Sequence, residues 1–490
     1  MKTLQWKKLS VRKFSASRYE IIAQIFCDDF YLSEFGSNVL NLLVVPERGN
    51  HATYLDANEW EGFAKSLYQT VAKSRETFDR YKLMIQHDQK HFIGVCGDVG
   101  SQDLTNASEE QLLEWFEAYV AAYQQYFRTS ILIPFIMEPL ISDDARRQLE
   151  NILSERKLDA KFQHYFDAIF LPEEKNAITQ EREDLLRIVE DADLHSLSEV
   201  DVNFRLEEHT AKYRWIPCYD INDKPWGVET FRKLYDDLRA DHWQEELEDL
   251  VHFGNRATGF QTALDELVTT VDQRVLFTIV HDIVFLKDER DDFRRRGSYL
   301  IQPFFSELAK RMGGLSLDEV SNLLQREVQV FLGTGTLPLR SKIKERTDGF
   351  AMLKTPREAE VRIYSGPEVS AVAHEQLGDQ PERQGNFLEG IVASEGVTSG
   401  PARLVITKDD LAKIQPGDIM VAVTTHPDYV PAMRKCAGIV TDEGGLTAHA
   451  AIISRELQIP CLVGVQTATA IFSDGDQITL DASAGFVRKS

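Results

Sequence analysis

The part of the chain that decides its fold reads Thr441-Asp-Glu-Gly-Gly-Leu-Thr-Ala-His-Ala-Ala-Ile-Ile-Ser-Arg-Glu-Leu457. The apolar run before it, Ala437-Gly-Ile-Val440, is typical of a buried strand. The pair Gly444-Gly445 allows a sharp backbone turn and the close approach of a ligand. The run after His449 is rich in helix-forming residues. The order is therefore a strand, a glycine turn, and a histidine in the first turn of a helix.

The histidine of this stretch, His449, is a candidate phosphoryl acceptor. A helix N-terminus offers unpaired N–H groups and a partial positive charge, which suit a phosphate. Thr447 is the expected N-cap of this helix. An unprotonated imidazole nitrogen can attack phosphorus, and near-neutral pH supplies that form of histidine. A histidine after two glycines is, by itself, more often a capping or packing residue, so the local pattern leaves both interpretations open.

The longer stretch from Thr441 to Gly464 resembles the phosphohistidine signature of the phosphoenolpyruvate-utilising enzymes. That family includes phosphoenolpyruvate synthase, pyruvate phosphate dikinase and rifampin phosphotransferase. The resemblance implies that His449 carries a phosphoryl group. It also implies that the glycine-rich turn, with Gly444, Gly445 and Thr447, holds the phosphoryl oxygens.

Three neighbouring residues have weaker claims to a role at this site. Glu443 could orient the imidazole ring, although a carboxylate close to a phosphate repels it. Arg455 follows His449 by six residues, more than one and a half helical turns, and is expected to pack or pair rather than catalyse. His426 departs from the acidic or small residue usual in relatives, and it is either a second functional histidine or an ordinary loop residue.

Residues 389–490 are expected to form a β/β/α domain that resembles the swivelling phosphohistidine domain of the same family, the PEP-utilising enzyme mobile domain. A linker is expected over residues 366–388, where glycine, proline and polar residues are frequent. Two helices are expected, at about 428–436 and 449–457. Short strands are expected at 390–393, 402–406, 418–423, 438–440, 461–463 and 477–480.

The chain before residue 366 predicts two further regions, so that the fold class as a whole is α/β multidomain. Residues 1–102 are expected to be mixed α/β, and residues 103–365 mostly helical. In the first region we expect strands over 39–45 and 92–96 and a helix over 57–77. In the second we expect helices at about 143–156, 179–200, 228–250, 258–296, 298–312 and 317–331.

The mostly helical region is the candidate domain for the acceptor substrate, and it loosely resembles the helical region before the phosphohistidine domain in rifampin phosphotransferase-like members. An apolar stripe within residues 112–123 is expected to be core. The charges of residues 287–296 alternate in sign, which indicates either a solvated helix face or an arginine patch, with Arg294 and Arg295, that meets an anionic substrate. His209 is either a pocket residue or a hydrogen-bonded core histidine.

Composition narrows the classes of partner and the compartment. The net charge of −23 argues against a nucleic-acid partner, because no basic tract is concentrated enough to follow a phosphate backbone. Five cysteines without a CxxC pair favour reduced thiols and indicate neither a disulfide framework nor a metal site. The N-terminus has no signal-peptide pattern, and no apolar run is long enough for a bilayer. We therefore expect a cytoplasmic protein without a membrane partner.

The resemblance also implies what a complete reaction needs. In relatives a nucleotide-grasp domain phosphorylates the histidine, and no stretch of residues 1–380 resembles that domain. No phosphoenolpyruvate-binding barrel follows before Ser490. We therefore expect a phosphotransferase component that works with a separate ATP-grasp-like subunit and a small-molecule acceptor. ATP or phosphoenolpyruvate would be the donor, with Mg²⁺ at the donor site. The alternatives are a non-catalytic binding or regulatory protein on the same fold, and a phosphocarrier that acts on a partner protein.

Overall fold

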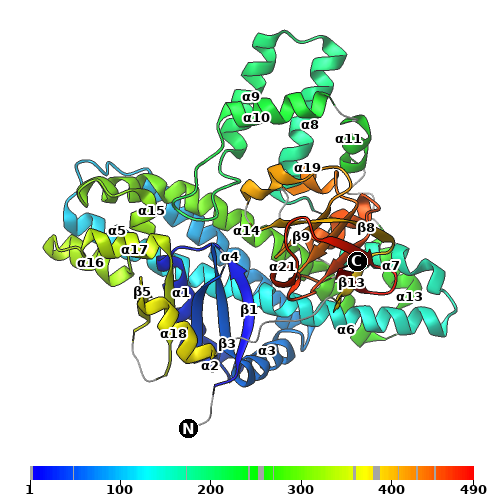
Figure 1. Cartoon of the computed structure of the whole chain (residues 1–490), viewed down its shortest axis with the longest axis horizontal. Coiled ribbons are helices and arrows are strands. Elements are labelled where there is room, and N and C mark those ends of the chain that lie inside the picture. The colour runs from blue at the N-terminus through cyan, green and yellow to red at the C-terminus, as the bar shows by residue number, and fades with distance from the viewer. Residues whose placement is uncertain are drawn as a thin grey trace. The chain divides into compact units, whose positions relative to one another are not determined.

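The computed structural model describes residues 4–47, 49–172, 174–240, 243–251, 259–268, 270–356, 360–378, 387–406, 408–425, 429–445 and 448–489. The fold is mixed α/β, as predicted, and it contains two sheets (Figure 1). The chain divides into two compact units. The first comprises Met1–Lys7, Phe14–Val44 and Leu55–Val369, and the second comprises Lys8–Lys13, Val45–Tyr54 and Ser370–Ser490.

The smaller sheet has five strands in the order β1-β3-β2-β4-β5. Its strands are β1 (Trp6–Arg12), β2 (Leu42–Glu47), β3 (Asn50–Asp56), β4 (Phe350–Lys354) and β5 (Arg362–Ser365). The strand predicted over 39–45 is confirmed, and it begins three residues later, at Leu42. β4 pairs antiparallel with β2, with Leu353 opposite Leu43. The stretch around residue 350, predicted as part of a mostly helical region, thus supplies strands to a sheet that starts near the N-terminus.

Helices make up most of the first unit. The predicted helix over 57–77 is confirmed as α3, where Phe63, Leu67 and Val71 form the buried face. The helices of the chain up to residue 377 are α1 (Ala16–Phe26), α2 (Asp29–Phe35), α3 (Ala57–Val71), α4 (Arg75–Gly100), α5 (Glu109–Tyr126), η1 (Phe127–Leu132), α6 (Ile133–Glu155), η2 (Asp159–Lys161), α7 (Phe162–Phe170), α8 (Ala177–His195), α9 (Glu199–Tyr213), α10 (Val228–Arg239), α11 (Trp243–Val251), α13 (Phe260–Leu267), α14 (Val271–Arg311), α15 (Leu317–Ser321), α16 (Gln325–Thr334), α17 (Arg340–Asp348) and α18 (Glu368–Leu377).

Several details of the helical prediction are wrong. The helices predicted over 228–250, 258–296 and 317–331 are each divided, into α10 and α11, α13 and α14, and α15 and α16 respectively. The short strand predicted over 92–96 is part of α4, because a five-residue apolar run fits a buried helix face as well as a strand. The helix break predicted at Gly297 does not occur, and α14 continues to Arg311. α18 also occupies part of the segment predicted as a linker.

Gly297 lets α14 pack closely against α4. A Cβ atom at Gly297 would lie only 2.5 Å from Cζ of Phe92, well inside van der Waals contact. Phe92 is buried and stacks on Tyr126 with ring centroids 4.6 Å apart, so its ring has little room to move. Gly297 is therefore a packing position within one long helix.

We expect Gly297→Ala to destabilise the protein, because its methyl group overpacks the contact between α4 and α14. The expected loss in the free energy of unfolding is about 1–3 kcal/mol, measured by urea denaturation. Gly94→Ala is the matched control, since an added Cβ there meets no atom within 4 Å. In this helix interior the alanine should stabilise by up to about 1 kcal/mol. Equal effects of the two substitutions would contradict the packing role.

Helices α8 to α11 share a core of their own within the first unit (Figure 1, green). It contains Leu186 and Val189 of α8, Leu206 of α9, and Phe231 and Tyr235 of α10. α10 has polar residues on one side and apolar residues on the other, so one face supplies buried side chains and the opposite face meets solvent.

The second sheet has eight strands in the order β6-β13-β12-β8-β9-β10-β11-β7. β8, β9, β10 and β11 run parallel, and the remaining pairs are antiparallel. All six strands predicted in this part of the sequence are present. Its elements are β6 (Phe387–Glu389), β7 (Ile391–Ser394), β8 (Val397–Val405), η3 (Lys408–Lys413), β9 (Ile419–Ala422), α19 (Val430–Met433), β10 (Gly438–Thr441), α20 (His449–Glu456), β11 (Cys461–Val463), α21 (Ala468–Ile471), β12 (Gln477–Asp481) and β13 (Phe486–Lys489).

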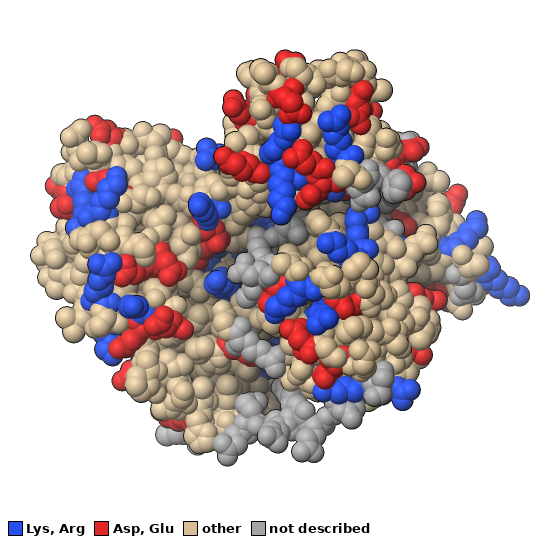
Figure 2. All heavy atoms as spheres, turned by 45° about the horizontal axis from the view of Figure 1, so that its top comes forward, with Lys and Arg blue, Asp and Glu red and all other residues tan. Residues whose placement is uncertain are grey.

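The surface of the molecule carries charge of both signs. On the face drawn in Figure 2, lysine and arginine side chains lie among aspartate and glutamate side chains. In the part of the chain that the structure describes, no helix combines the length and the apolar character needed to cross a membrane.

Candidate functional site

The site around His449 forms where two neighbouring parallel strands end. β9 ends at Ala422 and β10 ends at Thr441, and these two residues pair with each other. The chain after β10 turns into α20, whose first residue is His449. The carboxyl ends of parallel strands are where open α/β sheets place their ligands. The predicted order of strand, glycine turn and helix-starting histidine is therefore confirmed.

The imidazole of His449 is held by a threonine from the neighbouring strand end. Its Nδ1 atom lies 2.8 Å from Oγ1 of Thr425, in hydrogen-bonding distance. Thr425 is only 4% exposed, so its hydroxyl is fixed by packing, whereas His449 is half-buried. When Nδ1 carries the proton and donates it to Thr425, the lone pair that can attack phosphorus is on Nε2.

Within the turn, position 444 is the one that requires a glycine. Its φ of +116° is a conformation that other residues rarely adopt. A Cβ atom there would also lie 2.9 Å from the Cβ of Ala448. Gly445 has open space around its Cα, and its carbonyl accepts a hydrogen bond of 3.0 Å from the N–H of Ala448. The two predicted glycines thus build the turn that leads into His449, but only Gly444 is required by its backbone.

α20 is anchored by the small side chains that follow the histidine. Ala450 and Ala451 are buried in a core with Met420, Ala422 and Cys461 of the sheet. This packing of small residues brings the N-terminus of the helix close to the strand ends, and so it positions His449. The N-cap residue is Ala448, with no side-chain capping bond, rather than Thr447 as predicted. Thr447 and His426 lie outside the described residues.

The acidic residues before the glycine turn have partners of their own. Glu443 accepts hydrogen bonds from the backbone N–H of Val11, at 2.8 Å, and from Nη1 of Arg12, at 2.7 Å. The arginine offsets a negative charge that would otherwise repel a phosphate near His449. Asp442 accepts hydrogen bonds from the backbone N–H and the hydroxyl of Thr469, which tie the turn to α21. Burial raises the pKa of Asp442, although these hydrogen bonds oppose the shift.

Arg455 lies in the last turn of α20, at the opposite end from His449. At 1.5 Å per residue, six residues separate the two Cα atoms by about 9 Å along the helix. A basic residue is favourable at this position because the C-terminal end of a helix has partial negative charge. The geometry thus places Arg455 where it complements the helix dipole.

Arg294 and Arg295, predicted as acceptor-side candidates, lie inside the first unit and are only 7% and 4% exposed. For these two arginines, the interpretation of residues 287–296 as a solvated face is therefore wrong. α14 is covered by other helices, so its charges pair within the fold, as Lys287 does with Glu138 at 2.6 Å. Both arginines stack on the ring of Tyr219, with guanidinium-to-centroid distances of 4.8 and 4.2 Å.

His209, the third acceptor-side candidate, lies in the core that α8, α9 and α10 share. Its Nε2 atom is 2.9 Å from Oε1 of Glu181, and both residues are buried. Its ring also contacts those of Tyr213 and Phe231, with centroid distances of 4.9 and 4.8 Å. Of the two interpretations, the hydrogen-bonded core histidine describes these contacts. His209 and the two arginines therefore occupy different surroundings.

One residue of the site was missed in the sequence analysis. Thr425 belongs to the Thr424–Asp428 segment, in which only His426 had drawn attention. Its position shortly after the apolar run of β9 could have indicated its role. The carboxyl ends of neighbouring parallel strands lie side by side, so a residue that follows β9 comes close to one that follows β10. Among the described residues, no three His, Cys, Asp or Glu side chains are grouped so that they could hold a metal ion. We therefore assign none of them to the Mg²⁺ expected at a donor site.

We expect Thr425→Val to slow phosphorylation of His449 without unfolding the domain. Valine matches the shape of threonine but cannot hydrogen-bond to Nδ1. Losing one such bond, worth about 1.5 kcal/mol, corresponds to a rate about tenfold lower. The rate of phosphate incorporation measures the effect, and Thr425→Ser, which keeps the hydroxyl, should stay near the rate of the unchanged protein. An unchanged rate in Thr425→Val would show that the contact does not position the ring.

Comparison with known proteins gives matches over this part of the chain. Residues 414–485 match the family model described as PEP-utilising enzyme, mobile domain. A probable phosphoenolpyruvate synthase of Archaeoglobus fulgidus is 44% identical over 115 residues, which are 24% of this chain and 15% of that protein. The phosphoenolpyruvate synthase of Pyrococcus furiosus is 47% identical over 103 residues, 21% of this chain and 13% of that protein.

A bacterial relative shows the same pattern. The phosphoenolpyruvate synthase of Pseudomonas aeruginosa is 41% identical over 99 residues, 20% of this chain and 12% of that protein. The chain thus spans between 12% and 15% of the length of these three relatives. The matched segment contains the glycine turn, His449 and the elements that position them. Residues 414–485 thus match the mobile domain of the PEP-utilising enzymes.

Proposed function

We propose that this protein is a phosphotransferase component that carries a phosphoryl group on Nε2 of His449. The observation that carries the proposal is the hydrogen bond between Nδ1 of His449 and the buried Thr425. It holds the ring at the start of α20, and when Nδ1 carries the proton the nucleophilic lone pair is on Nε2. The similarity to phosphoenolpyruvate synthases supports the same chemistry.

The step is a displacement at phosphorus. The Nε2 lone pair forms a bond to the phosphorus of the donor's transferable group, and the bond between that phosphorus and its leaving oxygen breaks. The proton on Nδ1 stays in place, donated to Thr425. N–H groups at the N-terminus of α20 and in the Gly444–Gly445 turn are suited to the phosphoryl oxygens. In the transfer step, an atom of the acceptor forms a bond to phosphorus, and the bond between phosphorus and Nε2 of His449 breaks.

The exposure of His449 favours a carrier over a protein that only retains the fold. A fully buried imidazole could not meet a donor. His449 is half-buried and lies near the carboxyl ends of β9 and β10, where open α/β sheets place their ligands. We propose a nucleotide-binding, ATP-grasp-like partner as the source of the phosphoryl group, with ATP or phosphoenolpyruvate as donor and Mg²⁺ at that partner's site. The proposed acceptor is a small molecule bound by the first unit.

Phosphate incorporation tests the proposal. The purified chain would be incubated with ATP and, separately, with phosphoenolpyruvate, each with Mg²⁺ and with or without extract of the source cells. Intact mass would detect the added phosphoryl group. Its loss in mild acid and retention in alkali would distinguish phosphohistidine from phosphoserine.

The outcomes separate the possible donors. Incorporation only with extract supports a separate donor partner and provides an assay for its purification. Incorporation by the isolated protein would contradict the separate partner but support the carrier. No incorporation under any condition would overturn the carrier and leave a binding protein on an inherited fold.

A further inference from the structure

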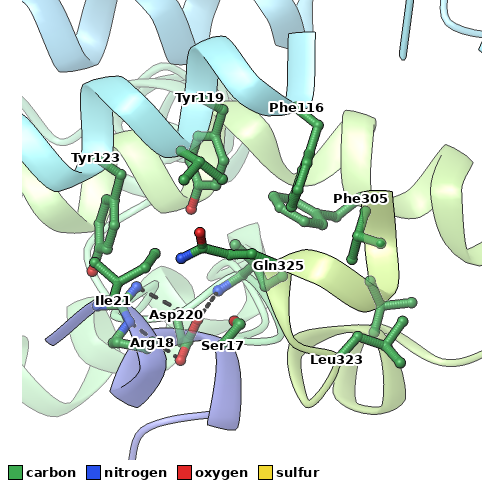
Figure 3. Close-up of a pocket in the computed structure, with 14 residues that line it drawn as sticks. Ser17, Arg18, Ile21, Phe116, Tyr119, Tyr123, Asp220, Phe305, Leu323 and Gln325 are labelled. Carbon is green, nitrogen blue, oxygen red and sulfur yellow. Dashed lines mark hydrogen bonds and ion pairs between the residues drawn. The ribbon is translucent and has the colours of Figure 1, made fainter. Parts of the chain in front are cut away.

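The first unit contains a cavity that the site around His449 does not use. It lies among α1, α5, α14, α15 and α16, and Figure 3 shows the side chains that line it. Its walls are mostly aromatic and aliphatic, including Phe116, Tyr119 and Phe305. The residues of α5 that were predicted as ordinary core thus also form the wall of a cavity. Its polar end is formed by Arg18, Asp220 and neighbouring residues.

Arg18 has hydrogen-bonding capacity that the protein leaves unused. It is 2% exposed, and its Nη1 atom has no hydrogen-bond partner among the described residues. Its other nitrogens face protein groups: Nη2 lies 3.4 Å from Asp220 and 3.3 Å from Ser298, and Nε forms an ion pair with Asp220 at 3.4 Å. A buried charged group with an unpaired nitrogen destabilises the fold, because that nitrogen has lost its hydrogen bonds to water. A ligand that accepts a hydrogen bond from it binds favourably, since the arginine is already held in place.

A second unused donor lies beside Arg18. The hydroxyl of Tyr123 is buried and without a partner among the described residues, and its ring centroid is 5.2 Å from the Arg18 guanidinium carbon. Burial raises the pKa of Tyr123 to about 12, so this phenol stays protonated and can donate. In Figure 3 the Tyr123 hydroxyl lies on the Arg18 side of the cavity, and the polar ends of Tyr119 and Gln325 point toward one another in its middle.

The charge of Asp220 does not make this end of the cavity acidic. Asp220 accepts hydrogen bonds from the backbone N–H and the hydroxyl of Ser15, at 3.2 and 2.8 Å, and from the N–H of Ile221, at 2.8 Å. Burial alone would lower the pKa of Arg18, but the attraction of Asp220 and further neighbouring groups together outweighs that effect and raises the pKa, so Arg18 remains charged. The cavity therefore presents donors and a fixed cation, which select a ligand with anionic acceptor atoms.

We propose that this cavity binds a small carboxylate with a short apolar body. The carboxylate oxygens would accept hydrogen bonds from Nη1 of Arg18 and from the hydroxyl of Tyr123, and the apolar part would contact the aromatic wall. The cavity volume is about 30 Å³, whereas a cavity that holds one water needs roughly 10–15 Å³. That space suits a ligand of a few heavy atoms. If the proposed function holds, this cavity is a candidate site for the small molecule that accepts the phosphoryl group. The binding of a carboxylate in the cavity does not itself require His449.

Calorimetric titration of the full chain tests the inference. The probes are the sodium salts of formate, acetate, isobutyrate and benzoate, with inorganic phosphate for comparison. We expect affinity to rise from formate to isobutyrate, because apolar contact grows, and to fall for benzoate, which exceeds the space. His449→Ala should bind isobutyrate as the unchanged protein does, so a failure of the phosphoryl-carrier proposal would leave this result intact.

Two substitutions and one control decide whether binding occurs in this cavity. Tyr123→Phe should weaken isobutyrate binding about tenfold, the equivalent of one hydrogen bond to a charged group. Tyr235→Phe is the matched control, since Tyr235 also has a buried hydroxyl without a partner in the described part of the chain, but lies in the core of α8 to α11. Val120→Trp, at a half-buried position of the lining, should abolish binding by filling the cavity.

Any one of the following results would overturn the inference. The first is equal affinity of the Tyr123→Phe and Tyr235→Phe variants for isobutyrate. The second is unchanged binding by Val120→Trp, which would place the ligand elsewhere. The third is the absence of any carboxylate binding at millimolar concentration, or tighter binding of phosphate than of every carboxylate.

Discussion

Replacement of His449 by asparagine is expected to abolish phosphate incorporation altogether. Asparagine keeps a polar side chain of similar reach, but its amide nitrogen has no lone pair available to attack phosphorus. Loss of a catalytic nucleophile lowers rates by several orders of magnitude, about 10⁶-fold in the best-measured case, so no acid-labile phosphate should accumulate. Intact mass after incubation with donor and extract measures the result.

The control for this experiment is another histidine of the same chain. His164 lies on α7 and is exposed, so His164→Asn changes the same chemical group without touching the site. It should incorporate phosphate as the unchanged protein does. Residual acid-labile phosphate on His449→Asn would show that a different residue accepts the phosphoryl group, and the site would then have to be sought elsewhere.

Replacement of Arg18 by methionine should cause the largest loss of stability among the substitutions considered. The change leaves Asp220 buried, at 6% exposed, without the cation that offsets its charge. Breaking a buried ion pair in this way costs about 3–5 kcal/mol. The free energy of unfolding from urea denaturation, measured without added carboxylate, gives the effect. The double variant Arg18→Met/Asp220→Asn should lose less, because it removes the uncompensated charge.

An exposed ion pair provides the comparison for Arg18. Arg232 and Glu199 lie 2.6 Å apart with side chains that are 30% and 69% exposed. Since water screens such a pair, Arg232→Met should change stability by no more than about 1 kcal/mol. If Arg18→Met and Arg232→Met destabilise the protein equally, the charge of Arg18 is not buried in the way the structure indicates.

The expected arrangement around His449 came largely from local patterns. Short apolar runs between turn residues predict strands, and all six expected in residues 390–480 are present. Gly444 has the positive φ that the glycine pair suggested, and α20 begins at His449. These features depend on neighbours within a few residues, so a sequence pattern can predict them. The same holds for α3, where apolar residues recur at helical spacing.

Other features depend on residues far apart in the sequence. Phe92 lies in a helix because α14 covers it, and Gly297 is a packing position because Phe92 stands against it. β4 joins the sheet of β2 across about 300 residues of chain. No local pattern distinguishes a packed glycine from a helix end, or a buried arginine from a solvated one. The alternation of charge in residues 287–296 therefore could not decide between a solvated face and an arginine patch.

For this protein, the order of residues was enough to find His449 as the candidate phosphoryl acceptor, because its turn, helix and strand are contiguous in the chain. Tertiary packing was needed to identify Thr425 as the partner of Nδ1, since it lies 24 residues before His449 and meets it only when β9 and β10 pair. Packing was also needed to reveal the donors of Arg18 and Tyr123 in one cavity, because burial, which makes those donors valuable, is a property of the whole fold.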